Sequence, residues 1–320
     1  MAAPLHCEYR QKCGEPTILP LSAPKIPCCQ FQFSSTDGLG IACARWDPCG
    51  SAHGIVQIAH GMGEHMGRYV GLIEVLVEAG LIVYGNDHRG HGRTAPSPKA
   101  LGDLGAGGFH LLAEDMFHLT LIAKRENPGK PLILLGHSMG SFAAQLYAID
   151  HSRDVAGLAL SGSGALDELV QLAKSTPREE DDILNRAFQP ARTSFDWLSR
   201  DTEVVDAFMN DPLCFGTLQP SSIESFFAAA CALADPASLR KIRSDLPIYL
   251  FTGSDDPVGL RLEGLRILIE RYSAAGLQDI AHDFYPRHEM LNEINRVEVR
   301  TNLLRWISSV LEGHASGEAA

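Results

Sequence analysis

Residues 131–141 read PLILLGHSMGS, an apolar run followed by a turn that carries a serine between two glycines. The apolar run is typical of a short buried strand, and the residues after the turn, up to Asp150, predict a helix. Between a strand and a helix, the pattern G-x-S-x-G forms a sharp turn that holds its serine in a strained backbone conformation. Gly136 and Gly140 leave room there because they carry no side chain. The stretch therefore predicts Ser138 as a nucleophile.

Other apolar segments alternate with helical ones on both sides of this turn. Runs that are apolar on both faces are typical of parallel strands covered by helices. The predicted strands lie at residues 55–60, 81–88, 131–135, 155–162, 246–253 and 280–285. The predicted helices lie at residues 68–79, 109–122, 139–150, 261–272 and 292–311. The sequence thus predicts an α/β fold with a mostly parallel central sheet and helices on both faces.

The alternation stops after residue 163 and resumes at residue 246. The stretch between them carries an acidic run at 179–182 and scattered large apolar side chains, with almost no strand pattern, so we expect a helical insertion. The N-terminal residues are rich in proline and cysteine and lack a periodic pattern. The predicted division is an irregular leader at 1–30, a core at 31–163 and 246–313, the insertion at 164–245 and a polar tail at 314–320.

The chain of 320 residues has 27 Lys and Arg against 39 Asp and Glu, a formal net charge of -12 at pH 7. This acidic balance, without a run of Lys or Arg, argues against nucleic-acid binding and against electrostatic docking on an anionic membrane. No apolar stretch is long enough to span a bilayer, and the N-terminus lacks the pattern of a secretory signal. We therefore expect a cytoplasmic protein whose membrane contact, if any, is peripheral and made by the insertion.

The cysteines could form disulfides or bind a metal ion, and two histidines could also be metal ligands. An even count of eight cysteines permits disulfides, but a chain of this length without a secretory signal does not need them. No CxxC pair occurs, and the adjacent Cys28 and Cys29 are poorly placed to hold one tetrahedral metal ion. We interpret His88 and His91, in the glycine-rich loop 87–92, as structural hydrogen-bonding residues. We expect reduced thiols, no metal and no cofactor.

A serine hydroxyl becomes a nucleophile only when a base takes its proton and an acid orients that base. For a serine on such a turn the chain order is serine, acid, histidine, which leaves His282, His288 and His314 as candidates. His282 lies within a predicted strand, and His314 lies in the polar tail. His288 follows a strand end in a loop, from which a side chain can reach over the sheet edge. We therefore predict His288 as the base.

The acid should follow the preceding strand, and residues 246–253 lead directly into Ser254, Asp255 and Asp256. Both aspartates lie at the carboxyl end of this strand, where the sites of open α/β sheets assemble. The residues alone leave the choice between Asp255 and Asp256 open.

The negative oxygen that forms during acyl transfer needs two backbone N–H donors. One comes from the residue after the nucleophile, here Met139, and the other from a loop after an earlier strand. The loop HGMGEH at residues 60–65 follows a predicted strand, and its Met62 is the predicted second donor.

Five motifs follow one another along the chain: HGMGEH, DHRGHGRT, GHSMGS, GSDDPV and RHEMLNE. With them, residues 31–311 resemble the monoacylglycerol lipase and lysophospholipase group of the α/β-hydrolases, which is also classed with serine aminopeptidases. The resemblance implies an α/β-hydrolase fold in which the insertion forms a cap over the site. It also implies a catalytic triad and two oxyanion donors, and the matching residues are Ser138, Asp256, His288, Met62 and Met139.

Two features depart from this group. One or two small residues are expected between the proline and the Arg-His pair, whereas Pro286, Arg287 and His288 follow one another directly. The histidine loop is therefore expected to be short. The leader at residues 1–30 has no counterpart in the group.

The resemblance implies a serine esterase that forms an acyl-enzyme with single-chain lipid esters, either monoacylglycerols or lysophospholipids. Four alternatives share this fold: a short-chain carboxylesterase, a peptidase or amidase, an acyltransferase that prefers an alcohol over water, and a ligand-binding protein without turnover. A dehalogenase or epoxide hydrolase is disfavoured, because such enzymes have a carboxylate at the position of Ser138.

Overall fold

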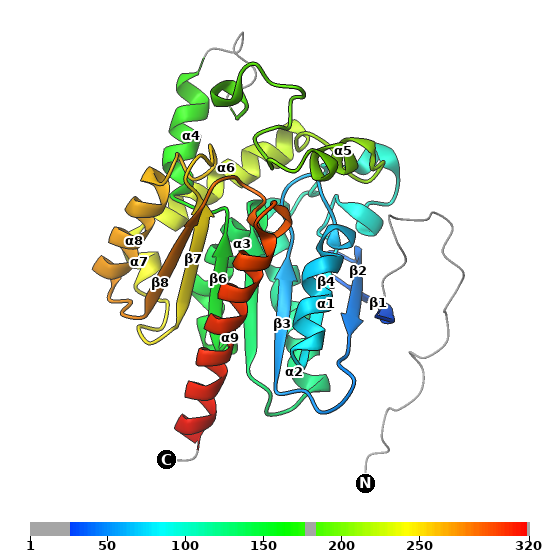
Figure 1. Ribbon diagram of the computed structural model, residues 1–320, viewed down its shortest axis with the longest axis vertical. Helices are drawn as coiled ribbons and strands as arrows, with labels where there is room; N and C mark the ends of the chain where they lie inside the picture. The colour runs from blue at the N-terminus through cyan, green and yellow to red at the C-terminus, as the bar shows by residue number, and fades with distance from the viewer. Residues whose placement is uncertain (1–25, 177–183, 319–320) are drawn as a thin grey trace.

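A computed structural model describes residues 26–176 and 184–318 of the chain. Its centre is a twisted eight-stranded sheet (Figure 1). The strands are β1 (Cys28–Ser34), β2 (Gly40–Trp46), β3 (Gly54–Ala59), β4 (Leu81–Asn86), β5 (Leu132–His137), β6 (Gly157–Ser161), β7 (Ile248–Gly253) and β8 (Ile280–Tyr285). Their order across the sheet is β1-β2-β4-β3-β5-β6-β7-β8.

The strands from β3 to β8 run parallel, whereas β2 pairs antiparallel with β1 and β4. The strand β5 lies near the middle, with its Gly136 opposite Ala59 of β3 and Leu160 of β6. The loops that follow β3, β5, β7 and β8 therefore meet at one edge of the sheet. The prediction of a mostly parallel α/β sheet is confirmed, and each of the six predicted strands overlaps one of β3 to β8.

Helices cover both faces of the sheet, as the sequence predicts (Figure 1). Residues of α1 and α9 form one buried cluster with the sheet, and residues of α2, α3 and α8 form the other. Leu72 and Leu76, one turn apart on α1, are 1% and 0% exposed, which is the spacing of an amphipathic helix. The bounds are α1 (Val70–Glu78), α2 (Gly108–Glu126), α3 (Met139–His151), α8 (Glu263–Ala275) and α9 (Arg296–Glu318).

The insertion between β6 and β7 is helical and has no strand in the part that the structure describes. Phe226 of the insertion packs against Phe109 and Phe142 of the core, with ring centroids 4.8 and 5.8 Å apart. Its large apolar side chains thus extend the core on the side of α2 and α3. The acidic run at 179–182 lies outside the described residues. The helices of the insertion are α4 (Leu166–Ser175), α5 (Thr202–Asn210), α6 (Pro220–Ala234) and α7 (Pro236–Leu239).

Two predicted boundaries are wrong. The strand β1 begins at Cys28, because pairing with β2 orders residues whose own pattern is too short to predict a strand. The irregular leader therefore cannot extend to residue 30, and residues 1–25 lie outside the described part. The helix α9 continues to Glu318, so most of the expected polar tail is helical. Polar residues such as glutamate favour a helix, and no proline ends this one.

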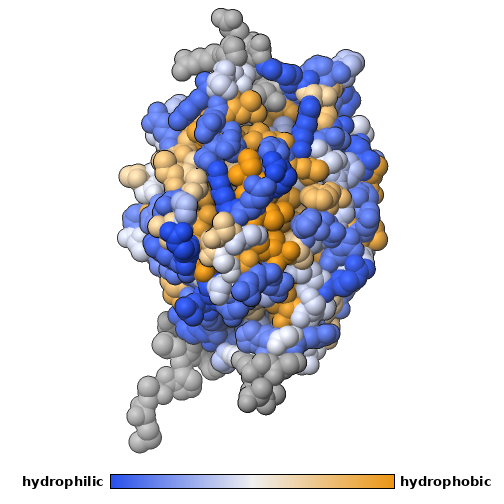
Figure 2. All heavy atoms as spheres, turned by 90° about the vertical axis from the view of Figure 1, so that its left-hand side faces the viewer, coloured by the Kyte–Doolittle hydropathy of each residue, from blue (hydrophilic) through white to orange (hydrophobic). Residues whose placement is uncertain are grey.

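One face of the molecule carries apolar side chains in contact with solvent. Figure 2 shows hydrophobic residues gathered along the middle of the face on which β8 forms the sheet edge, with hydrophilic residues around them. Phe284 of β8 is 50% exposed. Among the described residues, no helix combines the length and the apolar character that crossing a bilayer requires.

Candidate active site

Ser138 lies in the turn between β5 and α3. Its backbone angles, φ 53° and ψ -123°, fall where residues other than glycine are rare. Its N–H donates to the Ser161 carbonyl at 2.8 Å, and its own carbonyl accepts a hydrogen bond of 2.6 Å from the Ser141 hydroxyl. Gly140 allows α3 to approach β3 closely, because a Cβ there would lie 2.3 Å from the Ala59 carbonyl oxygen. The surrounding structure thus holds the strained serine in place.

Asp256 and His288 meet at the same edge of the sheet. Asp256 follows β7 and His288 follows β8, and Nδ1 of the imidazole lies 2.8 Å from Oδ2 of the carboxylate. The carboxylate also accepts hydrogen bonds from the Thr252 hydroxyl at 3.1 Å and the Val258 N–H at 2.9 Å. Asp256 is 0% and His288 1% exposed. Because Nδ1 donates to the carboxylate, Nε2 is left as the basic nitrogen.

Burial and pairing act in opposite directions on the pKa values of these two groups. Burial alone would raise the pKa of Asp256, but the charge and hydrogen bond of His288 lower it below its usual value. Burial alone would lower the pKa of His288, but the Asp256 carboxylate raises it above 6.5. The pair therefore favours an imidazolium, which is the form that the predicted base would take after accepting a serine proton.

The other candidates for the acid and the base lie away from this pair. Asp255 is exposed, His282 is exposed on β8 with its ring 5.2 Å from that of Phe284, and His314 is exposed near the end of α9. In the described part of the chain, none of these three side chains is hydrogen-bonded to His288 or Asp256. Of the two adjacent aspartates, Asp256 is the one bonded to the imidazole.

The histidine loop is short, as the sequence indicates, and it still brings the imidazole to its carboxylate. Asp255 N–H donates to the Pro286 carbonyl at 3.1 Å, which joins the loop after β7 to the loop after β8. The direct succession of Pro286, Arg287 and His288 is therefore compatible with the bond between His288 and Asp256.

Two aromatic rings pack on His288. The ring of Trp197, from the insertion, and the ring of His137, the residue before the nucleophile, have centroids 4.8 and 4.9 Å from that of His288. Sequence reasoning missed Trp197, because nothing local marks one tryptophan among the large apolar residues of the insertion. Among the described residues, no hydrogen bond joins the Ser138 hydroxyl to His288. Such bonds are often long in enzymes without substrate and shorten when substrate binds.

The predicted oxyanion donors lie beside Ser138. A Cβ on Gly61 would lie 3.1 Å from the Ser138 Cβ, so the loop after β3 touches the serine. His60 Nδ1 donates to the Gly61 carbonyl at 2.8 Å, and in a trans peptide the next N–H, that of Met62, points the opposite way. Met139 is the first residue of α3, where N–H groups have no partner within the helix. The segments that carry the two predicted donors, Met62 and Met139, thus adjoin Ser138.

The histidines of the DHRGHGRT motif are buried behind this loop. The rings of His88 and His91 lie 4.2 and 5.2 Å from that of His60. His88 N–H donates to His60 Nε2 at 2.9 Å, and His91 Nδ1 donates to the Arg89 carbonyl at 2.9 Å. Burial lowers the pKa of all three imidazoles. All three rings are therefore neutral. The rings of His88 and His91, which we interpret as hydrogen-bonding groups, each have a partner at Nδ1 but none at Nε2 among the described residues.

The described residues contain one group with the side chains for a metal ion: His65, Asp211 and Cys214, whose ligand atoms lie within 4.8 Å of one another. His65 Nδ1 accepts a hydrogen bond of 3.2 Å from Gly67 N–H, so the proton is on Nε2, which donates to Asp211 at 2.9 Å. A metal ion would require Nε2 without its proton and Cys214 as a thiolate. Burial raises the pKa of the Cys214 thiol, which disfavours the thiolate. The geometry is that of a hydrogen bond between the insertion and the loop after β3.

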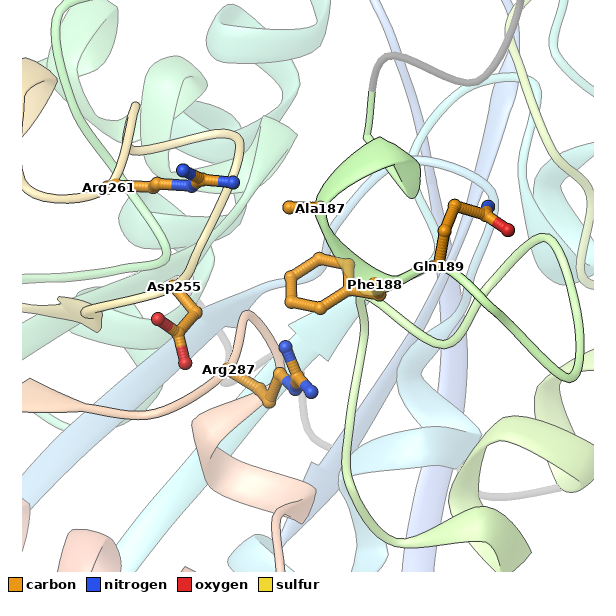
Figure 3. Close-up of a pocket in the computed structure, with 6 residues that line it drawn as sticks. All are labelled: Ala187, Phe188, Gln189, Asp255, Arg261 and Arg287. Atoms are coloured by element: carbon orange, nitrogen blue, oxygen red, sulfur yellow. The ribbon is translucent and has the colours of Figure 1, made fainter.

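A cavity of about 460 Å³ lies outside the loops that carry Asp256 and His288. Figure 3 shows the guanidinium groups of Arg261 and Arg287 directed toward the insertion. Arg287 Cζ lies 3.9 Å from the centre of the Phe188 ring. The lining is mainly polar, so this cavity is poorly suited to an acyl chain. Its lining residues are Ala187, Phe188, Gln189, Asp255, Arg261 and Arg287.

The order of the strands and the helical insertion after β6 define the α/β-hydrolase fold, and the strained serine after β5 marks the protein as a serine hydrolase. A family model described as serine aminopeptidase, S33, matches residues 50–295. The chain therefore belongs to the serine aminopeptidase S33 family.

Similar proteins cover between 57% and 90% of the chain. A monoacylglycerol lipase of Mycolicibacterium smegmatis is 30% identical over 290 residues, which are 88% of this chain and 98% of the relative. A human monoglyceride lipase is 31% identical over 194 residues, 57% of this chain and 62% of the relative. The crystal structure of a thermostable carboxyl esterase from Bacillus coagulans, in complex with glycerol, superposes with a TM-score of 0.80 at 30% identity and covers 90% of this chain and 100% of its own.

Proposed function

We propose that this protein hydrolyses the ester bond of monoacylglycerols. Relatives from a bacterium and from human carry the names monoacylglycerol lipase and monoglyceride lipase. The observation that carries the proposal is the bond of 2.8 Å between the buried His288 and Asp256, at the sheet edge where the strained Ser138 lies. An ordered acid and base beside a serine are the groups that acyl transfer needs.

In the proposed first step, Ser138 Oγ attacks the ester carbonyl carbon while His288 Nε2 takes the hydroxyl proton. Asp256 holds the imidazole through Nδ1 and stabilises the imidazolium. The carbonyl oxygen becomes negative and accepts hydrogen bonds from the N–H groups of Met62 and Met139. The C–O bond to glycerol then breaks, and His288 returns its proton to the leaving glycerol oxygen.

The second step reverses these roles with water. His288 takes a proton from water, the hydroxide attacks the acyl carbon, and the bond to Ser138 Oγ breaks as the serine regains a proton. The products are a fatty acid and the free enzyme. The two steps consume only the ester and water, so they require no cofactor.

We propose that the insertion, residues 164–245, acts as a cap that selects esters with one acyl chain. Trp197 of the insertion packs on His288, and Phe226 packs into the core below. Large apolar side chains beside a catalytic centre favour an alkyl chain over a polar substrate. Lysophospholipids share the single chain and are included in the proposed substrate class.

The second candidate function is hydrolysis of short-chain carboxylic esters. The likeness to a carboxyl esterase from Bacillus coagulans supports ester hydrolysis without specifying a lipid ester. The description of the family names an aminopeptidase, so amide hydrolysis is a further alternative. An acyltransferase would form the same acyl-enzyme.

The test is a panel of substrates with the Ser138→Ala variant as control. Monoacylglycerols, lysophospholipids, butyryl esters and matched acyl amides are compared by kcat/KM, and glycerol is added to detect acyl transfer. We expect monoacylglycerol hydrolysis that is absent in Ser138→Ala. Faster turnover of butyryl esters or amides, or a transfer product in place of fatty acid, would contradict the proposal.

We further propose a cytoplasmic location with peripheral contact of the insertion to membranes, where the substrate resides. Leu172 of α4 and Met209 of α5 are 43% and 50% exposed, as apolar contacts with a bilayer would require. Sedimentation with neutral lipid vesicles should be reduced in a Leu172→Ser, Met209→Ser variant. Equal sedimentation of this variant and the unchanged protein would refute the contact.

A further inference from the structure

Glu64, Arg68 and Glu289 form a charged network that neither the fold nor the triad explains. Glu64 belongs to the HGMGEH motif, and Glu289 follows His288 in RHEMLNE. Arg68 joins them, with Nη1 donating to Glu64 Oε2 at 3.0 Å and to Glu289 Oε1 at 2.5 Å. Its Nη2 donates to Glu289 Oε2 at 2.8 Å, so the contact with Glu289 is bidentate.

The network is almost entirely removed from solvent. The side chains of Glu64 and Glu289 are 3% and 4% exposed, and that of Arg68 is 9% exposed. Burial would lower the pKa of Arg68, but the two carboxylates raise it, so the guanidinium stays charged. Two carboxylates share one guanidinium, and the network therefore carries one uncompensated negative charge inside the protein.

At one end, the network holds the loop that carries the oxyanion donor. Glu64 Oε1 accepts hydrogen bonds from Gly61 N–H at 2.5 Å and from the Tyr69 hydroxyl at 2.6 Å. The carbonyl of Gly61 is bound by His60, as described above. Both sides of the residue before Met62 are thus fixed, which sets the direction of the Met62 N–H.

At the other end, the network reaches the proposed base and the insertion. Glu289 is the residue after His288, and its N–H donates to the carbonyl of Leu198 at 2.8 Å. Arg68 lies over the ring of Phe208, with Cζ 4.9 Å from the ring centre. The bidentate contact with Arg68 therefore restrains the backbone next to the imidazole.

We propose that Arg68 is a positioning residue that couples the oxyanion loop to the histidine loop, and that the net carboxylate charge of Glu64 and Glu289 stabilises the imidazolium of His288 during acyl transfer. This inference rests on the proposed esterase function. It gives a role to the glutamates of the first and last motifs, which the triad does not use. A fixed charge placed before the reaction needs no reorganisation when the imidazolium forms.

The charged and titratable groups around His288 come from four segments. Asp256 lies on the loop after β7, Glu289 adjoins His288, Glu64 lies on the loop after β3, and His137 ends β5. Burial and the charge of His288 lower the pKa of His137 to about 3, so His137 is neutral at the pH of an assay. Glu289 and Glu64 both raise the pKa of His288, in addition to Asp256. Removing one of these two charges should therefore make His288 less basic.

The experiment measures the pH profile of kcat/KM for monoacylglycerol in three variants of the full chain. Glu289→Gln removes a charge and retains the size of the side chain. Arg68→Lys retains the charge but loses the bidentate geometry. Glu270→Gln, on the exposed face of α8, removes a carboxylate that is paired with Arg266 and lies outside the network, and it is the control. Thermal unfolding of each variant is measured in parallel.

We expect the acid limb of the profile, which reports His288 in the free enzyme, to move to lower pH by about one unit in Glu289→Gln. In Arg68→Lys the acid limb should keep its position while kcat falls roughly ten- to hundredfold, as after a misplacement of about 1 Å. Glu270→Gln should match the unchanged enzyme in both quantities.

An unshifted acid limb in folded Glu289→Gln, or full kcat in Arg68→Lys, would overturn the proposal. If Glu289→Gln does not fold, Glu289→Asp replaces it, and its acid limb should stay in place while kcat falls. If Glu289→Asp also fails to fold, the network of Glu64, Arg68 and Glu289 stabilises the folded protein rather than the imidazolium, and the proposal is overturned. Absence of monoacylglycerol turnover in the unchanged protein is a separate result, which would refute the esterase function before any variant is compared.

Discussion

The loops at the sheet edge and the insertion meet at His288, but they contact it by different means. The loops use directed polar bonds, such as the hydrogen bond that His288 donates to Asp256 and those that Glu64 accepts from its neighbours. The insertion uses apolar surface, chiefly the ring of Trp197. Directed bonds fail when an atom moves by 1 Å, whereas apolar contact declines gradually with lost area. The loops should therefore determine whether the reaction occurs, and the insertion which ester reacts.

The largest expected effect is that of removing the nucleophile. Ser138→Ala should lower kcat by about 10⁴ to 10⁶-fold, because the acyl-enzyme cannot form. A fluorophosphonate should label the unchanged protein once, at Ser138, since only a serine with a base and an oxyanion site reacts readily. Mass spectrometry of the digested protein locates the label. Labelling of the folded Ser138→Ala variant at another serine would place the chemistry outside these loops.

The next effect separates two adjacent aspartates. Asp256→Asn should lower kcat by about 10⁴-fold, because the amide no longer fixes the imidazole tautomer. Asp255→Asn should stay within a few-fold of the unchanged enzyme, since Asp255 is exposed and makes no bond to His288. Likewise, His288→Ala should lower kcat far more than His282→Ala. Comparable losses from both aspartates would mean that the loop after β7 changes its conformation when substrate binds.

A smaller effect concerns the acyl chain and tests the insertion. Each buried methylene contributes roughly 0.8 kcal/mol, so extending an acyl chain from four to ten carbons could add up to about 5 kcal/mol. Even partial burial should raise kcat/KM about a hundredfold along a series of monomeric esters. Triacylglycerols of the same chain length should react slowly, because the proposed cap selects esters with one acyl chain. A decline beyond butyryl would identify a short-chain esterase, and efficient triacylglycerol hydrolysis would refute the selection of single-chain esters by the cap.

The sequence predicts most of the sheet edge because its motifs are local. The apolar strand, the turn and the helix around Ser138 are contiguous, and the strand-end positions of Asp256 and His288 follow from the order of strands. The choice between Asp255 and Asp256 needed a resemblance, because it depends on the path of one turn. In the structure Asp256 is 0% exposed and carries the bond to the imidazole.

The contacts between distant segments could not be predicted. Glu64 and Arg68 are four residues apart, a spacing that favours an ion pair in a helical turn, but nothing in the sequence links Arg68 to Glu289. Trp197 likewise reaches His288 from a helical insertion whose packing depends on the core beneath it. Such contacts are set by the assembled fold rather than by a local pattern.

The smallest predicted effect tests whether the insertion acts on the base or only on the substrate. Trp197 is 9% exposed, and its ring covers His288 with centroids 4.8 Å apart. Trp197→Ala should admit water to the imidazole and lower kcat/KM about tenfold, a change of roughly 1.4 kcal/mol in the barrier. Trp197→Phe keeps an aromatic ring at this place and should lose less.

The dependence of this loss on acyl length is the informative quantity. An equal loss for butyryl and decanoyl esters means that Trp197 acts through His288, because the base is common to both substrates. A loss confined to the longer ester means that the ring contacts the acyl chain instead. Glu203→Ala, an exposed change on α5 of the same insertion, should leave both rates unchanged. Full activity of Trp197→Ala on every ester would show that Trp197 does not influence the chemical step. The loops at the sheet edge would then determine that step without the insertion.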